Sequence, residues 1–113
     1  MTASVFIYSH ESSPALLRDG RQGLEAALQR LLGQDGDVTG GGSGTASCAW
    51  NIDLEITDSE ALESWLLRLA SFLRAWGAPA DTYIHGFPEN WVEGMQPITV
   101  LVFPRAPITE SSL

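Results

Sequence analysis

The chain has 113 residues, 44% of them hydrophobic, so it is long enough to close one hydrophobic core and too short to close two comfortably. It carries fourteen acidic residues against six arginines and no lysine, which gives a formal net charge of −8. Because nucleic-acid binding needs a clustered cationic surface, this balance argues against nucleic acid as a partner.

Cysteine content and hydropathy indicate one cytoplasmic domain. We expect a globular α+β domain over residues 1–104 and a loosely ordered tail over residues 105–113. Cys48 is the only cysteine, which excludes an intrachain disulfide and predicts a small buried hydrophobe. The N-terminus lacks the pattern of a signal peptide, and no apolar run is long enough to cross a bilayer. We therefore predict no membrane association.

A strand and a helix are predicted first. Residues 5–8 are apolar at both odd and even positions, so both faces of a strand here would be apolar. This pattern predicts a central strand covered on both sides. A helical stripe follows over residues 21–32, and Gly33 is placed to end it in a left-handed cap. Val38 and Thr39 form a possible short strand, and residues 40–44, four of them glycine, predict a flexible connection.

The clearest pattern lies in the middle of the chain. From Cys48 to Ile56 apolar residues occupy one parity, while the other carries Asn51, Asp53 and Glu55. Such alternation predicts a strand with one buried face and one solvated face.

A second helix follows this strand directly. Thr57 and Glu60 form a capping-box pattern, and apolar residues then repeat at helical spacing from Leu62 to Trp76 until Gly77 ends the run. Because the strand and the helix both need to bury an apolar side, the two predict a shared core between a sheet layer and a helix layer.

The C-terminal part predicts two further strands. These cover residues 82–85 and 98–103. The ten residues between them, 87–96, are many for a hairpin loop and include Trp91 and Met95, which a simple spacer would not need. This loop is therefore a candidate functional segment.

The order strand, helix, strand, strand, helix, strand, strand predicts a two-layer α+β sandwich. We expect a mainly antiparallel sheet with two helices on one face. The first six elements, over residues 4–86, resemble the βαββαβ arrangement of ferredoxin-like folds, with an additional C-terminal strand. This resemblance rests on element order and implies a fold without a function.

An open sheet face is the predicted binding surface. If Val5, Ile7, Val100 and Val102 point into the core, the opposite face receives aromatic and acidic side chains. The predicted protein-binding residues are Phe6, Tyr8, Asn51, Asp53, Glu55, Trp91, Leu101 and Phe103. Two outcomes stay open for the 87–96 loop, which either folds over this face as a lid or extends it.

The first functional hypothesis is a noncatalytic module that docks a protein partner or a second copy of itself as a homodimer. The acidic residues Asp53, Glu55, Glu89 and Glu93 would steer a basic partner toward the aromatic anchors. In size and acidity the chain is similar to many bacterial toxin-neutralising immunity proteins, and this resemblance in composition implies a toxin as the partner.

The alternative hypothesis is a small enzyme or small-molecule binder. Its pocket would lie between the 87–96 loop and the sheet and would use Asp53, Glu55 or His85 as acid, base or ligand. No catalytic residue, metal site or cofactor is predicted, because the glycine run lacks the lysine and the following helix of a phosphate loop. His10 and His85 do not recur at metal-ligand spacing.

Overall fold

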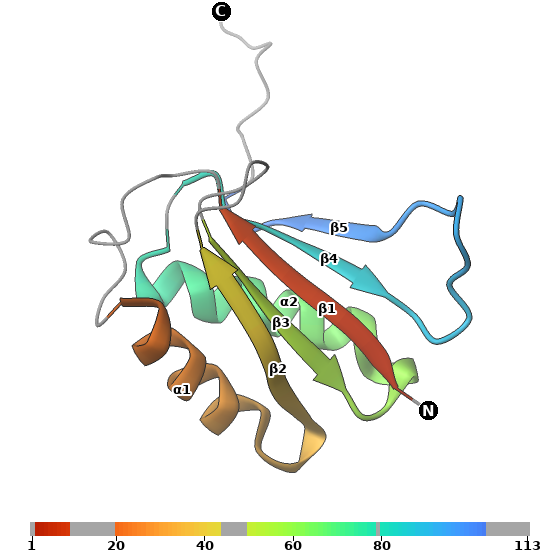
Figure 1. The fold of residues 1–113 in the computed structure, drawn as a ribbon, viewed down its shortest axis with the longest axis horizontal. Helices are drawn as coiled ribbons and strands as arrows, with labels where there is room; N and C mark the ends of the chain where they lie inside the picture. The colour runs from red at the N-terminus through yellow and green to blue at the C-terminus, as the bar shows by residue number, and fades with distance from the viewer. Residues whose placement is uncertain (1, 10–19, 44–49, 79, 104–113) are drawn as a thin grey trace, which may run out of the picture.

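The structure is a computed structural model that describes residues 2–9, 20–43, 50–78 and 80–103 (Figure 1). Its five strands and two α-helices are, in chain order, β1 (Ala3–Ser9), α1 (Gly20–Leu32), β2 (Gly36–Ser43), β3 (Trp50–Ile56), α2 (Leu62–Trp76), β4 (Tyr83–Phe87) and β5 (Ile98–Leu101). Short 3-10 turns, Gly33–Asp35 and Ser59–Ala61, precede β2 and α2. The predicted mixed α+β fold is confirmed. Cys48, His10 and the 105–113 tail lie outside the described residues.

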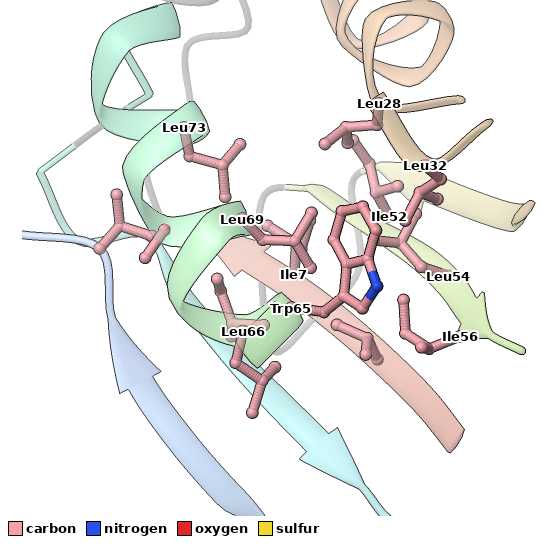
Figure 2. Packing of buried hydrophobic residues seen from close by; sticks show 14 of the residues in the cluster. Ile7, Leu28, Leu32, Ile52, Leu54, Ile56, Trp65, Leu66, Leu69 and Leu73 are labelled. Atoms are coloured by element: carbon pink, nitrogen blue, oxygen red, sulfur yellow. The ribbon is translucent and has the colours of Figure 1, made fainter. Parts of the chain in front are cut away.

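The strands form one antiparallel sheet in the order β2-β3-β1-β4-β5. Helix α1 joins β1 to β2, which lie on either side of β3, and α2 joins β3 to β4, which lie on either side of β1. Helix α1 packs on β2, and α2 packs on β4 and β5. Both helices contribute to one core against the same sheet face (Figures 1 and 2). The other face carries no helix from the described part of the chain.

The core lies between this covered face and the two helices. Ile7 of β1 pairs with Ile52 of β3 on one side and with Ile84 of β4 on the other, and all three side chains are fully buried. Figure 2 shows Leu28 and Leu69, one from each helix, pointing into the same cluster. Burial of aliphatic side chains on one parity of each strand is what joins the sheet to the helices.

Strand β1 is central in the sheet, as residues 5–8 predict, but the helices of the described structure cover only one of its two faces. Val5 and Ile7 are buried, whereas Phe6 and Tyr8 are half-buried on the opposite face. The apolar residues on both parities therefore do not indicate a strand between two covering layers. They supply a core on one side and an aromatic surface on the other.

The second helix matches the predicted stripe, but its cap differs. Leu62, Leu69 and Leu73 are among its buried residues. Asp58 caps the 3-10 turn that leads into the helix, where its Oδ1 accepts a hydrogen bond from the Glu60 N–H at 3.0 Å. The α-helix itself begins after Ala61 without a side-chain cap, so the predicted capping role of Thr57 is wrong. Asp is at least as good an N-cap as Thr, and here it is one residue closer to the helix.

Strand β2 includes residues 40–43, which corrects this part of the flexible connection predicted over residues 40–44, while Gly44 lies outside the described residues. Gly40 pairs with Asp53 and Gly42 with Asn51, after a register shift between Val38 and Gly40. Glycine has little preference for a strand by itself, yet the neighbouring β3 supplies the hydrogen-bond ladder that holds it extended. Tertiary pairing thus overrides local propensity.

A side chain from α1 covers part of the outer edge of β2. The Gln29 Oε1 accepts a hydrogen bond from the Val38 N–H at 3.0 Å, and its Nε2 donates to the Gly36 carbonyl at 3.3 Å. These bonds occupy backbone groups that an additional strand would otherwise use.

The last strand is shorter than predicted, which changes the place of Phe103. Strand β5 ends at Leu101, and the Val102 N–H donates to the Thr82 carbonyl at 3.1 Å. Val102 is buried as predicted, and Phe103 packs partly buried against the core cluster. Because the bond at Val102 is the last one to the neighbouring strand, strand alternation no longer decides which way Phe103 points. The prediction that Phe103 lies on the open face is wrong.

Neither described helix combines the length and apolar character needed to cross a membrane.

The core assignment predicts unequal effects of two leucines on the same helix. Leu69 is fully buried, whereas Leu67 is 65% exposed. We expect Leu69→Ala to lower the free energy of unfolding by about 2–5 kcal/mol, through lost burial and the cavity that remains. Leu67→Ala, the matched control, should change it by less than about 0.5 kcal/mol. Urea denaturation measures both values, and equal effects would contradict the assignment.

A close contact between β4 and α2 makes a second prediction. A Cβ added at Gly86 would meet the Leu66 Cδ1 at 2.9 Å, so Gly86→Ala should destabilise the fold by about 1–3 kcal/mol through overpacking. At Gly40 the nearest atom to an added Cβ is the Asp53 Oδ2 at an ordinary 3.6 Å, so Gly40→Ala is the control. Thermal unfolding of both variants gives the comparison, and a Gly86→Ala protein as stable as the control would mean that the Leu66 and Leu62 side chains can repack around the added methyl group.

Candidate docking face

The open sheet face is built from side chains that strand pairing places in cross-strand rows. The central row contains Gly40, Asp53, Phe6, His85 and Thr99, one from each strand in sheet order. Beside it lies the row of Gly42, Asn51, Tyr8, Tyr83 and Leu101. Side chains directly opposite one another lie about 4.5–5.5 Å apart at Cβ, so each row is a set of contacting groups.

Six rings gather on this face over β1, β4 and the loop that follows β4. We call Phe6, Tyr8, Tyr83, His85, Phe87 and Trp91 the ring cluster. Tyr8 and Tyr83 stack with centroids 5.1 Å apart, and His85 lies 5.4 Å from Tyr8. At the other end Phe87 meets Phe6 edge to face at 5.3 Å. These separations and angles are those that aromatic pairs prefer, so the rings form one continuous surface.

Partial burial keeps His85 neutral within the ring cluster. Desolvation lowers its pKa from the ordinary value of 6.5, because the charged imidazolium loses hydration among the rings. At neutral pH the side chain is therefore mainly an uncharged ring, with one nitrogen able to donate a hydrogen bond and the other able to accept one. It acts here as part of an aromatic surface.

A polar row on β3 borders the ring cluster. It consists of Asn51, Asp53 and Glu55, whose side chains share the open face. The Asn51 Nδ2 donates to the Asp53 Oδ1 at 2.8 Å, which fixes the orientation of the carboxylate. The Asp53 Oδ2 lies toward Gly40, which has no side chain to cover it. The row thus presents an oriented carboxylate next to Phe6.

The connection between β4 and β5 extends the open face. The Trp91 N–H donates to the Pro88 carbonyl at 2.9 Å, and the Met95 N–H donates to the Val92 carbonyl at 3.1 Å, so the segment forms two closed turns. Trp91 packs edge to face on Phe87 at 4.9 Å. Figure 1 shows this segment running outward from the end of β4 before it returns to β5.

This geometry decides between the two outcomes left open for the loop. Val92 and Met95 are 59% and 46% exposed, so their side chains are not packed down on the sheet. The Glu89 N–H also donates to the Ser59 Oγ at 3.0 Å, which ties the loop to the turn before α2. The loop therefore extends the aromatic surface and is not a lid over it.

The arginines of the described structure belong to the helical layer. Arg30 lies on α1, and Arg68 and Arg74 lie on α2, while Arg18 and Arg105 lie outside the described residues. Arg68 packs over the Trp65 ring, and Arg74 donates to the Val102 carbonyl. Arg21 also belongs to α1. The strands carry carboxylates and no arginine.

The groups required by the enzyme hypothesis do not converge. Phe6 stands between Asp53 and His85 in the central row, which separates their backbones by two strand spacings, roughly 10 Å. A hollow of about 320 Å³ lies elsewhere, at the start of α2, and its lining includes Asp58, Trp65 and Arg68. Within the described residues, no three His, Cys, Asp or Glu side chains gather as a metal site would need.

The structure brings together most of the residues predicted for the binding surface. Phe6, Tyr8, Asn51, Asp53, Glu55 and Leu101 share the open face, and Trp91 adjoins it through Phe87. Tyr83 and Phe87 were missed. Their signal is the aromatic residue at every second position of Tyr83-Ile84-His85-Gly86-Phe87, which becomes informative once β4 is paired with β1.

No family model matches this chain, and no curated protein or solved structure is similar enough to count as a match. The function is therefore argued from the open face itself.

The lowered pKa of His85 predicts a pH dependence of stability. As the pH falls through 6.5, the unfolded chain binds a proton at His85 before the folded protein does, so the free energy of unfolding decreases. Below the folded-state pKa both states are protonated and the loss is complete. His85→Phe should remove this part of the dependence while it keeps a ring.

Chemical denaturation of both proteins at pH 7.5 and 5.5 measures the effect. The native protein should lose more stability over this interval than His85→Phe, since all other titrating groups are shared. An equal loss in the two proteins would show that the ring cluster does not disfavour the imidazolium.

Proposed function

We propose that this protein is a noncatalytic protein-binding module and that its docking surface is the open sheet face with the 87–96 loop. The observation that carries the proposal is the ring cluster, six rings in mutual contact on a face that no described helix covers. Tyrosine, tryptophan and phenylalanine are enriched at protein interfaces, where they supply much of the binding energy. A face needed only for solubility would carry polar side chains in their place.

The size of the face explains why the loop belongs to the docking surface. Five strands at about 4.8 Å spacing and some 20 Å in length project to roughly 480 Å². A standard interface buries about 800 Å² of accessible surface per partner, so a flat sheet of this size provides a limited contact area by itself. Trp91, Val92 and Met95 extend the surface beyond β4 with two exposed apolar side chains and a half-buried indole.

Mutual support among the rings favours docking without large rearrangement. Tyr8 touches Phe6, Tyr83 and His85, so its orientation is limited before any partner arrives. Rigid aromatic side chains lose little conformational freedom on binding, which leaves more of the interaction energy for affinity.

We also infer that the sheet follows the ferredoxin-like plan, with β5 as an added edge strand. Two features support this inference: the order of β1, α1, β2, β3, α2 and β4, and the two helical crossovers, each of which skips one antiparallel strand. We place the module in the cytoplasm, as its single cysteine and acidic composition suit a reducing compartment.

A charge placed within the ring cluster tests the proposed surface. Phe6→Glu introduces a carboxylate at the centre of the face, and Leu67→Glu, on an exposed site of α2, is the matched control. Proteins captured from native lysate by the unmodified chain would be purified and their affinities measured by titration calorimetry. We expect Phe6→Glu to weaken binding more than about tenfold and Leu67→Glu to leave it unchanged.

Circular dichroism confirms that each variant is folded before binding is compared. Equal affinity for Phe6→Glu and the unmodified chain would overturn the proposal, as would an equal loss caused by Leu67→Glu.

A further inference from the structure

The open face joins two kinds of group that together suit one chemistry. Phe6 belongs to the ring cluster, and its partner across the strand pair is Asp53 of the β3 polar row. A cation placed over the Phe6 ring therefore has a carboxylate within reach of the neighbouring strand. Rings attract cations through their negative faces, and a carboxylate adds a charge-assisted hydrogen bond.

Asp53 is prepared to receive a donor. Its Oδ1 already accepts the Asn51 amide at 2.8 Å, which fixes the plane of the carboxylate. Its Oδ2 faces Gly40, where an added Cβ would come within 3.6 Å, so the glycine leaves this oxygen approachable from the β2 side. The glycine run in β2 thus has a consequence for binding, since a larger residue there would cover the carboxylate.

We propose, building on the docking function above, that the partner presents an arginine-bearing basic segment whose guanidinium stacks on Phe6 and pairs with Asp53. Arginine suits this position better than lysine, because its planar group stacks on a ring and still donates in its own plane. The chain already contains such a contact on its other layer, where the Arg68 guanidinium carbon lies 3.8 Å from the Trp65 ring centroid.

Charge complementarity extends beyond this one position. Glu55 lies on the same face one row from Asp53, Asp37 pairs with Glu55 from β2, and Glu89 and Glu93 are exposed in the loop. The described arginines belong to the helices, so the open face keeps a negative field. The negative field attracts a basic segment electrostatically, and it also increases the rate at which such a segment associates with the face.

The same charges disfavour two other occupants. A second copy docked face to face would enclose Asp53 and Glu55 of both molecules in one interface, to which the described strands bring no arginine to neutralise them. Nucleic acid would bring phosphates against the polar row, although its bases could stack on the rings. An arginine-bearing protein segment can stack on the rings and form ion pairs with the carboxylates at the same time.

Titration with synthetic peptides tests the inference. The probe is a ten-residue peptide of alternating arginine and glycine, and the reference peptides replace arginine by lysine or by glutamate. Binding to the full chain is followed by backbone amide chemical shifts at low salt. We expect the arginine peptide to shift amides of β1, β3 and β4, the lysine peptide to bind several-fold more weakly, and the glutamate peptide not to bind.

Three variants separate the specific contact from general charge. Asp53→Asn keeps the shape and should weaken the arginine peptide about tenfold, and Phe6→Leu should weaken it about threefold. Glu63→Gln removes an exposed carboxylate from α2 and should leave the affinity unchanged. Raising the salt from 0.05 to 0.5 M should weaken binding, because exposed charges are screened.

Several results would overturn the inference. These are equal binding by Asp53→Asn, an equal loss in Glu63→Gln, no arginine-peptide binding at millimolar concentration, tighter binding of a single-stranded oligonucleotide, or a dimer by light scattering that Phe6→Glu dissociates. If Phe6→Glu still abolishes capture of a protein partner while the arginine peptide fails to bind, the docking face stands and only the partner chemistry is wrong.

Discussion

The pairing of β1 with both β3 and β4 is the constraint on which the rest of the structure depends. One register places Ile7 between Ile52 and Ile84 beneath the helices, and the same register places Phe6 between Asp53 and His85 on the other side. A slip of one residue would send the aliphatic side chains into water and the rings into the core. The hydrophobic core therefore fixes the geometry of the docking face, although the two share no side chain.

The two layers divide the work of stability and recognition. The two helices and the covered face hold the buried leucines and isoleucines, and the described arginines belong to the helical layer. The open face holds rings that support one another and carboxylates that remain hydrated. Since the recognition groups contribute little to the core, the open face can change its chemistry while the fold is kept, as expected where function resides in a site carried by a common architecture.

Sequence patterns predicted the elements well where burial alone decides them. Two patterns each predict a single structure: the alternation through Asn51, Asp53 and Glu55 predicts a strand, and the apolar stripe of α2 predicts a helix. Both are decisive because a strand or a helix must place its apolar side against a core. Long-range partners are not encoded in that way. Tyr83 and Phe87 join the site only because β4 lies beside β1, and nothing local to residues 83–87 specifies that neighbour.

The errors have physical causes of the same kind. The glycines at 40–42 are extended because β3 pairs with them, whereas their own propensity favours a flexible loop. Phe103 follows the point where the chain leaves the sheet. Extending the in-and-out alternation of the strand from Val100 to Phe103 therefore places Phe103 on the wrong side. In each case a tertiary contact overrules a rule that is valid only inside a regular element.

The Gln29 side chain has a consequence for how copies of this protein can meet. It occupies backbone groups at Gly36 and Val38 on the outer edge of β2, so a foreign strand cannot add there without displacing it. The opposite edge, β5, has four residues. Pairing between molecules through residues 36–38 of β2 is therefore disfavoured, which limits the growth of a continuous sheet from one molecule to the next.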